Sequence, residues 1–247
     1  MGTKIPWATD SWNPISGCDP ISEGCKNCYA RRMSHRLAGR FGYPESPHEF
    51  DVTLHPDRLE LPLHWKKPRM VFVNSMGDLF HDDVKDEWIK TVFNAMATDI
   101  LQPCWHTYLI LTKRPQRMAD FFVKNTTRGT LPWKNIWLGV TAENQVRADE
   151  RIPVLLSIPA AVHFVSVEPM LDQMFLRGYL IHPGNKLDWV IAGPETGAGA
   201  RPCNPAWIFD LWKQCHLACI PFFDKRDYVN LERRWPDAKA DKVEGGK

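Results

Sequence analysis

The sequence has no long apolar run. A helix that crosses a bilayer needs about 18 or more consecutive apolar residues, and no such stretch occurs among the 247 residues. The first residues, MGTKIPWATDSW, also lack the apolar segment of a secretion signal. We therefore expect a cytoplasmic protein that has no membrane partner.

An excess of charge of one sign is also absent. The 31 Lys and Arg residues nearly balance 29 Asp and Glu residues, for a net charge of +2. This balance excludes the strongly basic character of a general nucleic-acid-binding protein. A local basic surface remains open, and its candidates are Arg31, Arg32, Arg36, Arg40, Lys66, Lys67, Arg69, Lys113, Arg114 and Arg117.

Cysteine is scarce, and its seven copies are an odd number. In a reducing compartment we expect no disulfide framework, and clustered thiols there indicate metal or redox chemistry. Three of them, Cys18, Cys25 and Cys28, lie in NPISGCDPISEGCKNCYARRM with the spacing C-x6-C-x2-C. They could bind zinc with a fourth ligand, or three irons of a [4Fe-4S] cluster with the fourth iron left open.

The spacing alone does not choose between these sites. A zinc site would need a fourth ligand, from His35 nearby or from one of the distant residues Cys203, Cys215 and Cys219. Cysteines that bind no metal are a third alternative, because free cysteine is often simply buried.

Short apolar runs alternate with segments of helical periodicity from residue 69 onward. The runs are MVFVNSM, TYLILTKR, NIWLGVTAE, VHFVSVEP, DWVIAGPE and IPFFDKR. Such alternation predicts a parallel α/β fold, either an open doubly wound sheet or a full or partial (β/α) barrel. We expect one domain over residues 1–235, with a cysteine loop at 17–29 and a disordered tail at 236–247.

Polar side chains follow nearly every predicted strand. They are Asn74, Ser75, Asp78, Thr112, Lys113, Arg114, Thr141, Glu143, Ser166, Glu168, Glu195, Thr196, Asp224 and Lys225. The carboxyl ends of the strands of a parallel barrel meet at one mouth, so this series favours the barrel and predicts a shared site. Alternatively, each polar residue marks an exposed strand end or caps the next helix.

The cysteine segment and several later motifs resemble the phage- and plasmid-associated three-Cys-motif proteins, an uncharacterised family similar to radical S-adenosylmethionine (SAM) enzymes. These motifs are TLHPDRLELPLHWKKPRMVFVNSMGDLFHDDV, LTKRPQRM, NIWLGVTAENQVRADERIPVLL, FVSVEPML and GARPCNPAW. The resemblance implies a partial (β/α)6 barrel of radical-SAM type. It also implies a [4Fe-4S] cluster on Cys18, Cys25 and Cys28, with SAM on the open iron.

The chain departs from these relatives at three places. The usual radical-SAM spacing is C-x3-C-x2-C, which is shorter than the spacing here. Pro194 stands in GPETG where relatives read GGESG, so one backbone N–H is lost. Asp224 and Arg226 flank Lys225, which suggests a substrate pocket that differs from the common one.

The chemistry of SAM suggests roles for the residues that follow the strands. We expect SAM to be bound by Asn74, Ser75, Asp78, Thr112, Lys113, Glu143, Ser166, Glu168 and Gly193. We expect Lys113, Arg114, Arg201 and Lys225 to face an anionic substrate, and Glu195, which lies near the adenine, to be catalytic together with Lys225 and Arg201. Trp12, six residues before Cys18, is the tryptophan expected to line the site.

The resemblance therefore implies an iron–sulfur enzyme that uses 5′-deoxyadenosyl radical chemistry and an external electron donor. Phage association and the basic groups suggest modification or repair of a nucleotide or nucleic acid. The alternatives are a non-catalytic iron–sulfur or zinc protein that binds nucleic acid or a partner, and a redox sensor. The sequence does not indicate an oligomeric state.

Overall fold

The computed structural model describes the chain apart from residues 1–2, 4, 100–104, 126–131, 227–232 and 237–247. The described residues form a single α/β domain. Most of the predicted tail, from residue 237 on, lies outside the described residues. None of the described helices is both long and apolar enough to span a membrane.

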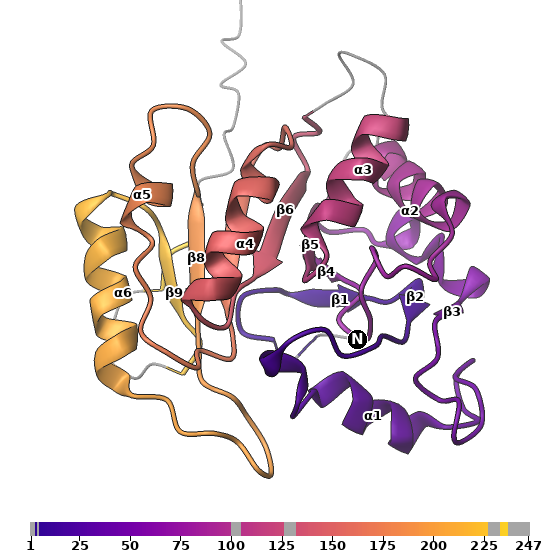
Figure 1. The fold of residues 1–247 in the computed structure, drawn as a ribbon. Coiled ribbons are helices and arrows are strands. Elements are labelled where there is room, and N and C mark those ends of the chain that lie inside the picture. The colour runs from indigo at the N-terminus through magenta and orange to yellow at the C-terminus, as the bar shows by residue number, and fades with distance from the viewer. Residues whose placement is uncertain (1–2, 4, 100–104, 126–131, 227–232, 237–247) are drawn as a thin grey trace, which may run out of the picture.

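A seven-stranded sheet forms the centre of the domain, in the order β1-β4-β5-β6-β7-β8-β9, and every neighbouring pair is parallel. The strands are Asp10–Trp12, Met70–Val73, Thr107–Thr112, Ile136–Thr141, His163–Val167, Trp189–Ala192 and Phe222–Asp224, in that order. The sheet curls into a half-barrel (Figure 1). Two short strands, β2 (Ile15–Ser16) and β3 (Thr53–Leu54), form a separate antiparallel pair.

Helices follow most of the strands. They are α1 (Tyr29–Leu37), α2 (Asp86–Asp99), α3 (Pro115–Asn125), α4 (Gln145–Leu156), α5 (Arg177–Leu180) and α6 (Pro205–Leu217). Three short 3-10 helices lie before β4, at Glu23–Cys25, Pro56–Arg58 and Leu61–His64. The first of them, η1, ends at Cys25 and places the cysteine loop directly before α1.

Both faces of the sheet are apolar, as the unbroken apolar runs predicted. Alternate strand residues such as Val71, Ile110 and Val165 pack in one large cluster with residues of the helices. The intervening residues form a second cluster on the concave face, with Phe72, Leu109, Trp137, Phe164, Trp189 and Phe223 among its members. The concave face is therefore an aromatic surface that ends in polar residues at the carboxyl ends of the strands.

The predicted parallel fold is confirmed, but the number of strands is wrong. All six predicted runs form strands, and β1 adds a seventh beside β4. Periodicity did not reveal β1, because its three residues, Asp10–Trp12, make no apolar run. The prediction that Trp12 lines the site is also wrong. Trp12 is buried beside Tyr108, and its indole N–H donates to the Arg58 carbonyl (2.7 Å).

Candidate functional site

A cavity of about 220 Å³ lies between the cysteine loop and the carboxyl ends of the strands. Cys18, Cys25 and Cys28 all line it, and all three are free and half-buried. The other predicted site residues on its wall are Asn74, Ser75, Asp78, Thr112, Lys113, Ser166, Glu168, Glu195 and Lys225. With Thr141 at the end of β6, which also lines the cavity, the structure brings polar residues of six strand ends to the three thiols.

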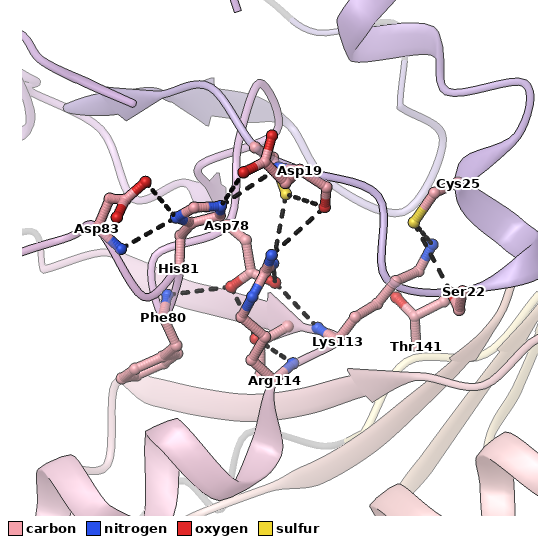
Figure 2. A network of polar contacts seen from close by, with 12 residues as sticks. Asp19, Ser22, Cys25, Asp78, Phe80, His81, Asp83, Lys113, Arg114 and Thr141 are labelled. Atoms are coloured by element: carbon pink, nitrogen blue, oxygen red, sulfur yellow. Dashed lines mark hydrogen bonds and ion pairs between the residues drawn. The ribbon is translucent and has the colours of Figure 1, made fainter. Parts of the chain in front are cut away.

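Cys18 lies beside a buried cation. The Nη1 atom of Arg114 is 3.4 Å from its Sγ atom and 3.5 Å from Oδ2 of Asp78 (Figure 2). Burial, together with the nearby Asp78 carboxylate, raises the pKa of Cys18 to about 11, and Arg114 offsets only part of this rise.

The carboxylate of Asp78 is already hydrogen-bonded within the protein. Its carboxylate accepts hydrogen bonds from the Thr112 hydroxyl (2.7 Å), the Lys113 backbone N–H (3.1 Å) and the Phe80 backbone N–H (3.0 Å). It therefore fixes the end of β5 beneath the cysteine loop, and it also lines the cavity, where its contact with SAM stays a prediction.

Cys25 faces an ammonium group. The Lys113 Nζ atom lies 3.6 Å from its Sγ atom, and the Ser22 hydroxyl lies 3.7 Å away (Figure 2). Burial alone would raise the pKa of Cys25, but Lys113 and hydrogen bonds at Ile21 and Ser22 outweigh it and lower the pKa. The thiolate is thus favoured at Cys25 and disfavoured at Cys18.

Glu143 does not line the cavity, although it was predicted to bind SAM. It is fully buried, accepts a hydrogen bond from the Gly24 backbone N–H (3.2 Å) and pairs with Arg151 (3.0 Å). A Cβ atom on Gly24 would lie 3.0 Å from a Glu143 oxygen, so glycine allows this close approach. Glu143 therefore joins the cysteine loop to β6 and α4.

A second contact holds the other side of the cysteine loop. Asn27 donates to Glu195 (2.8 Å) and to the Gly199 carbonyl (2.8 Å), while Arg201 donates to Glu195 and to the Glu23 carbonyl (3.0 Å). The hydrogen bond from Arg201 lowers the pKa of Glu195 to about 2, so the pair is charged at neutral pH. Arg201 does not line the cavity. Its hydrogen bonds join the segment after β8 to the cysteine loop.

Glu168, Gly193 and Lys225 follow three adjacent strands, β7, β8 and β9. The Lys225 ammonium contacts the Glu168 carboxylate, and both side chains line the cavity. A Cβ atom on Gly193 would lie 3.0 Å from Cβ of Lys225 and 3.4 Å from its Cδ. The absence of a side chain at Gly193 lets Lys225 reach across β8, and Gly193 itself does not line the cavity.

Two wall residues keep hydrogen-bonding atoms without a partner among the described residues. The indole Nε1 atom of Trp7 is buried without a partner. The Nδ2 atom of Asn74 is also buried without a partner. The buried residues Thr141 and Ser166, which are register partners on β6 and β7, add hydroxyl groups to the same wall. Trp7, Phe72 and Leu111 form an apolar part of the same wall.

Sequence reasoning missed Trp7 and Tyr29 as wall residues. Tyr29 directly follows Cys28, and its hydroxyl donates to the Ser75 carbonyl. Its place next to the cysteine motif was a usable signal. Trp7 gave none, because nothing in its surroundings links it to the strand ends.

The residues considered as a fourth zinc ligand are placed elsewhere. His35 pairs with Glu49, and Cys215 is one of the residues of α6 that are buried in the core. In the described part of the chain, a set of three ligand atoms within 4.8 Å of one another is formed by Asp19, His81 and Asp83, and the three thiols form no such set.

The family of the chain follows from its comparison with known proteins. The model of the family described as "Protein of unknown function (DUF5131)" matches residues 2–246. No curated protein and no solved structure matches the chain. The protein therefore belongs to the family of proteins of unknown function DUF5131.

Proposed function

We propose that this protein binds a [4Fe-4S] cluster through Cys18, Cys25 and Cys28 and binds SAM in the same cavity, as a radical SAM enzyme does. The observation that carries the proposal is the position of the three thiols, which line one cavity and, among the described residues, do not form a set of ligand atoms within 4.8 Å of one another. Sulfurs bound to a single zinc ion lie within about 4.6 Å of one another, since each Zn–S bond is about 2.3 Å long. A cluster distributes its thiolates over several irons.

The surroundings of the thiols suit a multiply charged group. Lys113 and Arg114 place cations beside Cys25 and Cys18, where they offset the negative charge of thiolates. The two contacts that tie down the loop, Glu143 to Gly24 and Asn27 to Glu195, fix the backbone that carries the thiols. These features favour a preformed site over three unligated core cysteines.

The remaining wall suits SAM and a substrate. The apolar surface of Trp7, Phe72 and Leu111 can take a base, and the unpartnered Nδ2 atom of Asn74 and the hydroxyl of Ser166 can bind polar atoms. When bound, the reduced cluster supplies the single electron that cleaves the sulfonium C–S bond of SAM. The residues of the chain position both molecules and exclude water from the cavity.

The substrate that we propose is a component of nucleic acid, which the enzyme modifies or repairs with electrons from an external donor. Its support is the combination of an aromatic wall with neutral hydrogen-bonding groups in one cavity. Tyr29, Glu168 and Lys225 lie on the side of the cavity formed by α1 and the ends of β7 and β9, where we place the substrate.

The test is reconstitution with iron and sulfide under anaerobic conditions, followed by spectra with and without SAM. We expect a cluster absorption that changes when SAM is added and that is missing in the Cys18→Ala, Cys25→Ala, Cys28→Ala variant. Cys219→Ala, at an exposed cysteine, is the control. A cluster that does not respond to SAM would refute the enzyme and leave a non-catalytic binding protein.

A further inference from the structure

The charges on the cavity wall do not favour an anionic ligand. Among the described residues that line it, Asp78, Glu168 and Glu195 are acidic, whereas Lys113 and Lys225 are basic. Asp78 and Glu195 are also paired with Arg114 and Arg201, which lie behind the wall. The wall as a whole is therefore close to neutral and offers a phosphate no strong attraction.

Neither of the two cations is available to a phosphate. Lys113 lies 3.6 Å from the Cys25 sulfur, and the Lys225 ammonium contacts the Glu168 carboxylate. The Lys225–Glu168 pair is the part of the wall that most resembles an anion site, and its two side chains are 19% and 22% exposed. A phosphate could use Lys225 only by displacing Glu168, which would leave a carboxylate beside the phosphate.

The polar side-chain atoms of the cavity wall that are buried without a hydrogen-bond partner among the described residues belong to neutral groups. They are the indole Nε1 of Trp7 and the amide Nδ2 of Asn74, and the hydroxyls of Thr141 and Ser166 lie on the same wall. Hydroxyls and amides recognise the hydroxyls of a sugar and the ring nitrogens and exocyclic groups of a base. Trp7, Phe72 and Leu111 supply the apolar surface for a flat ring on the same wall.

We infer that the substrate cavity takes an unphosphorylated molecule of the nucleoside class, and that the Glu168–Lys225 ion pair excludes the corresponding nucleotide. This inference rests on the proposed function and narrows its substrate class. Glu168 acts as the specificity-determining residue, because its carboxylate neutralises Lys225 and repels phosphate. Gly193 is needed for the pair, since a side chain there would displace Lys225.

The experiment compares matched ligands on the full chain, purified without oxygen, by calorimetry. The probes are the four ribonucleosides and their 5′-monophosphates, and the proteins are the wild type, Glu168→Gln, and Glu168→Gln combined with Lys225→Met. Glu87→Gln, at an exposed glutamate of α2 outside the cavity wall, is the matched control. Iron is counted in each sample, so a missing cluster is recognised separately from a failure of ligand binding.

In the wild type and in Glu87→Gln, we expect at least one nucleoside to bind about tenfold or more tightly than its monophosphate. In Glu168→Gln the monophosphate should gain about tenfold in affinity, and the added Lys225→Met change should remove that gain. Tighter binding of the monophosphate to the wild type would overturn the inference. It would also fail if Glu168→Gln, folded as judged by its thermal transition, left the ratio unchanged, or if no nucleoside bound at all.

Discussion

Cys18 and Cys25 differ in their surroundings although both line one cavity. Burial and Asp78 raise the pKa of Cys18, whereas Lys113 and local hydrogen bonds outweigh burial and lower the pKa of Cys25. Lys113 and Arg114 are consecutive at the end of β5, so one strand end supplies a cation to each of these thiols. Lys113 and Arg114 therefore influence how much negative charge the thiols of the cysteine loop can carry.

Lys113→Met should make a bound cluster harder to reduce. Removal of a cation next to the Cys25 sulfur leaves more negative charge at the cluster, so the potential should fall by ~60 mV, a tenfold change in the equilibrium for one electron. Spectra recorded during a potentiometric titration measure the shift. Lys90→Met, at an exposed lysine of α2, should leave the potential unchanged, and an equal shift in both variants would contradict the role of Lys113.

Glu143→Gln should destabilise the protein by about 3 kcal/mol, because it leaves the buried Arg151 guanidinium without its carboxylate. Urea denaturation measures this loss in free energy of unfolding. The double change Glu143→Gln with Arg151→Met should recover part of the loss, since no unpaired charge remains. A single variant as stable as the wild type would show that the ion pair does not hold β6 and α4 together.

Two elements fix the cysteine loop from opposite sides. The turn after β6 reaches Gly24 through Glu143, and the segment between β8 and α6 reaches Asn27 and Glu23 through Glu195 and Arg201. Between β2 and α1, the 3-10 helix η1 is the one regular element that the loop contains. Its shape therefore depends on the contacts with the strand ends as well as on its own backbone hydrogen bonds, such as those from Cys25 to Ser22 and from Cys28 to Cys25.

Arg201→Met should loosen this loop. The side chain donates charged hydrogen bonds to Glu195 and to the Glu23 carbonyl, and each such bond is worth about 1.5–3 kcal/mol when its partner is charged. We expect backbone amides of residues 19–28 to exchange hydrogen about tenfold faster, as measured by mass spectrometry. Arg177→Met, at an exposed arginine of α5, serves as the control. Unchanged exchange in the loop would refute the contact as a restraint.

The start of α2 supplies a prediction about pH. Hydrogen bonds from Lys124 and Arg117 lower the pKa of Asp86 from 3.8 to about 2. A carboxyl with a lowered folded-state pKa stabilises the fold above its unfolded pKa, and this contribution disappears as the pH falls from about 4 toward 2. Asp86→Asn should therefore cost about 1–2 kcal/mol at pH 7.

Denaturation of the wild type and Asp86→Asn between pH 7 and pH 3 checks this prediction. The difference in free energy of unfolding should be full at pH 7 and should shrink below pH 4. Asp120→Asn, at an exposed carboxylate bonded to Gln116 on α3, should show no such trend. A difference that stays constant with pH would contradict the assigned interaction.

At the scale of the whole molecule, the sequence predicted the parts of the fold that depend on apolar runs. Strands β4 to β9 are buried on both faces, so each appears as an unbroken run. The sequence did not predict β1, because this strand is short and partly polar and its place in the sheet depends on pairing with β4. Local sequence carries no information about such a partner.

The site was predicted in the same uneven way. Parallel strands bring their carboxyl ends together, so Asp78, Ser166 and Lys225 could be placed in one site from their positions after strands. Glu143 and Arg201 could not be distinguished from wall residues, because their partners Arg151 and Glu195 are set by side-chain directions in the folded chain. A polar residue after a strand thus predicts nearness to the mouth, but does not tell whether it faces the ligand or holds the loop.

The central claim is that the three thiols hold a cluster and not a single ion. The most direct measurement is the iron, sulfide and zinc content per chain of protein purified and reconstituted without oxygen, alongside the triple Cys18→Ala, Cys25→Ala, Cys28→Ala variant. We expect about four irons and four sulfides per chain in the wild type and none in the variant. One zinc ion per chain with no iron, or iron that the variant retains, would contradict it.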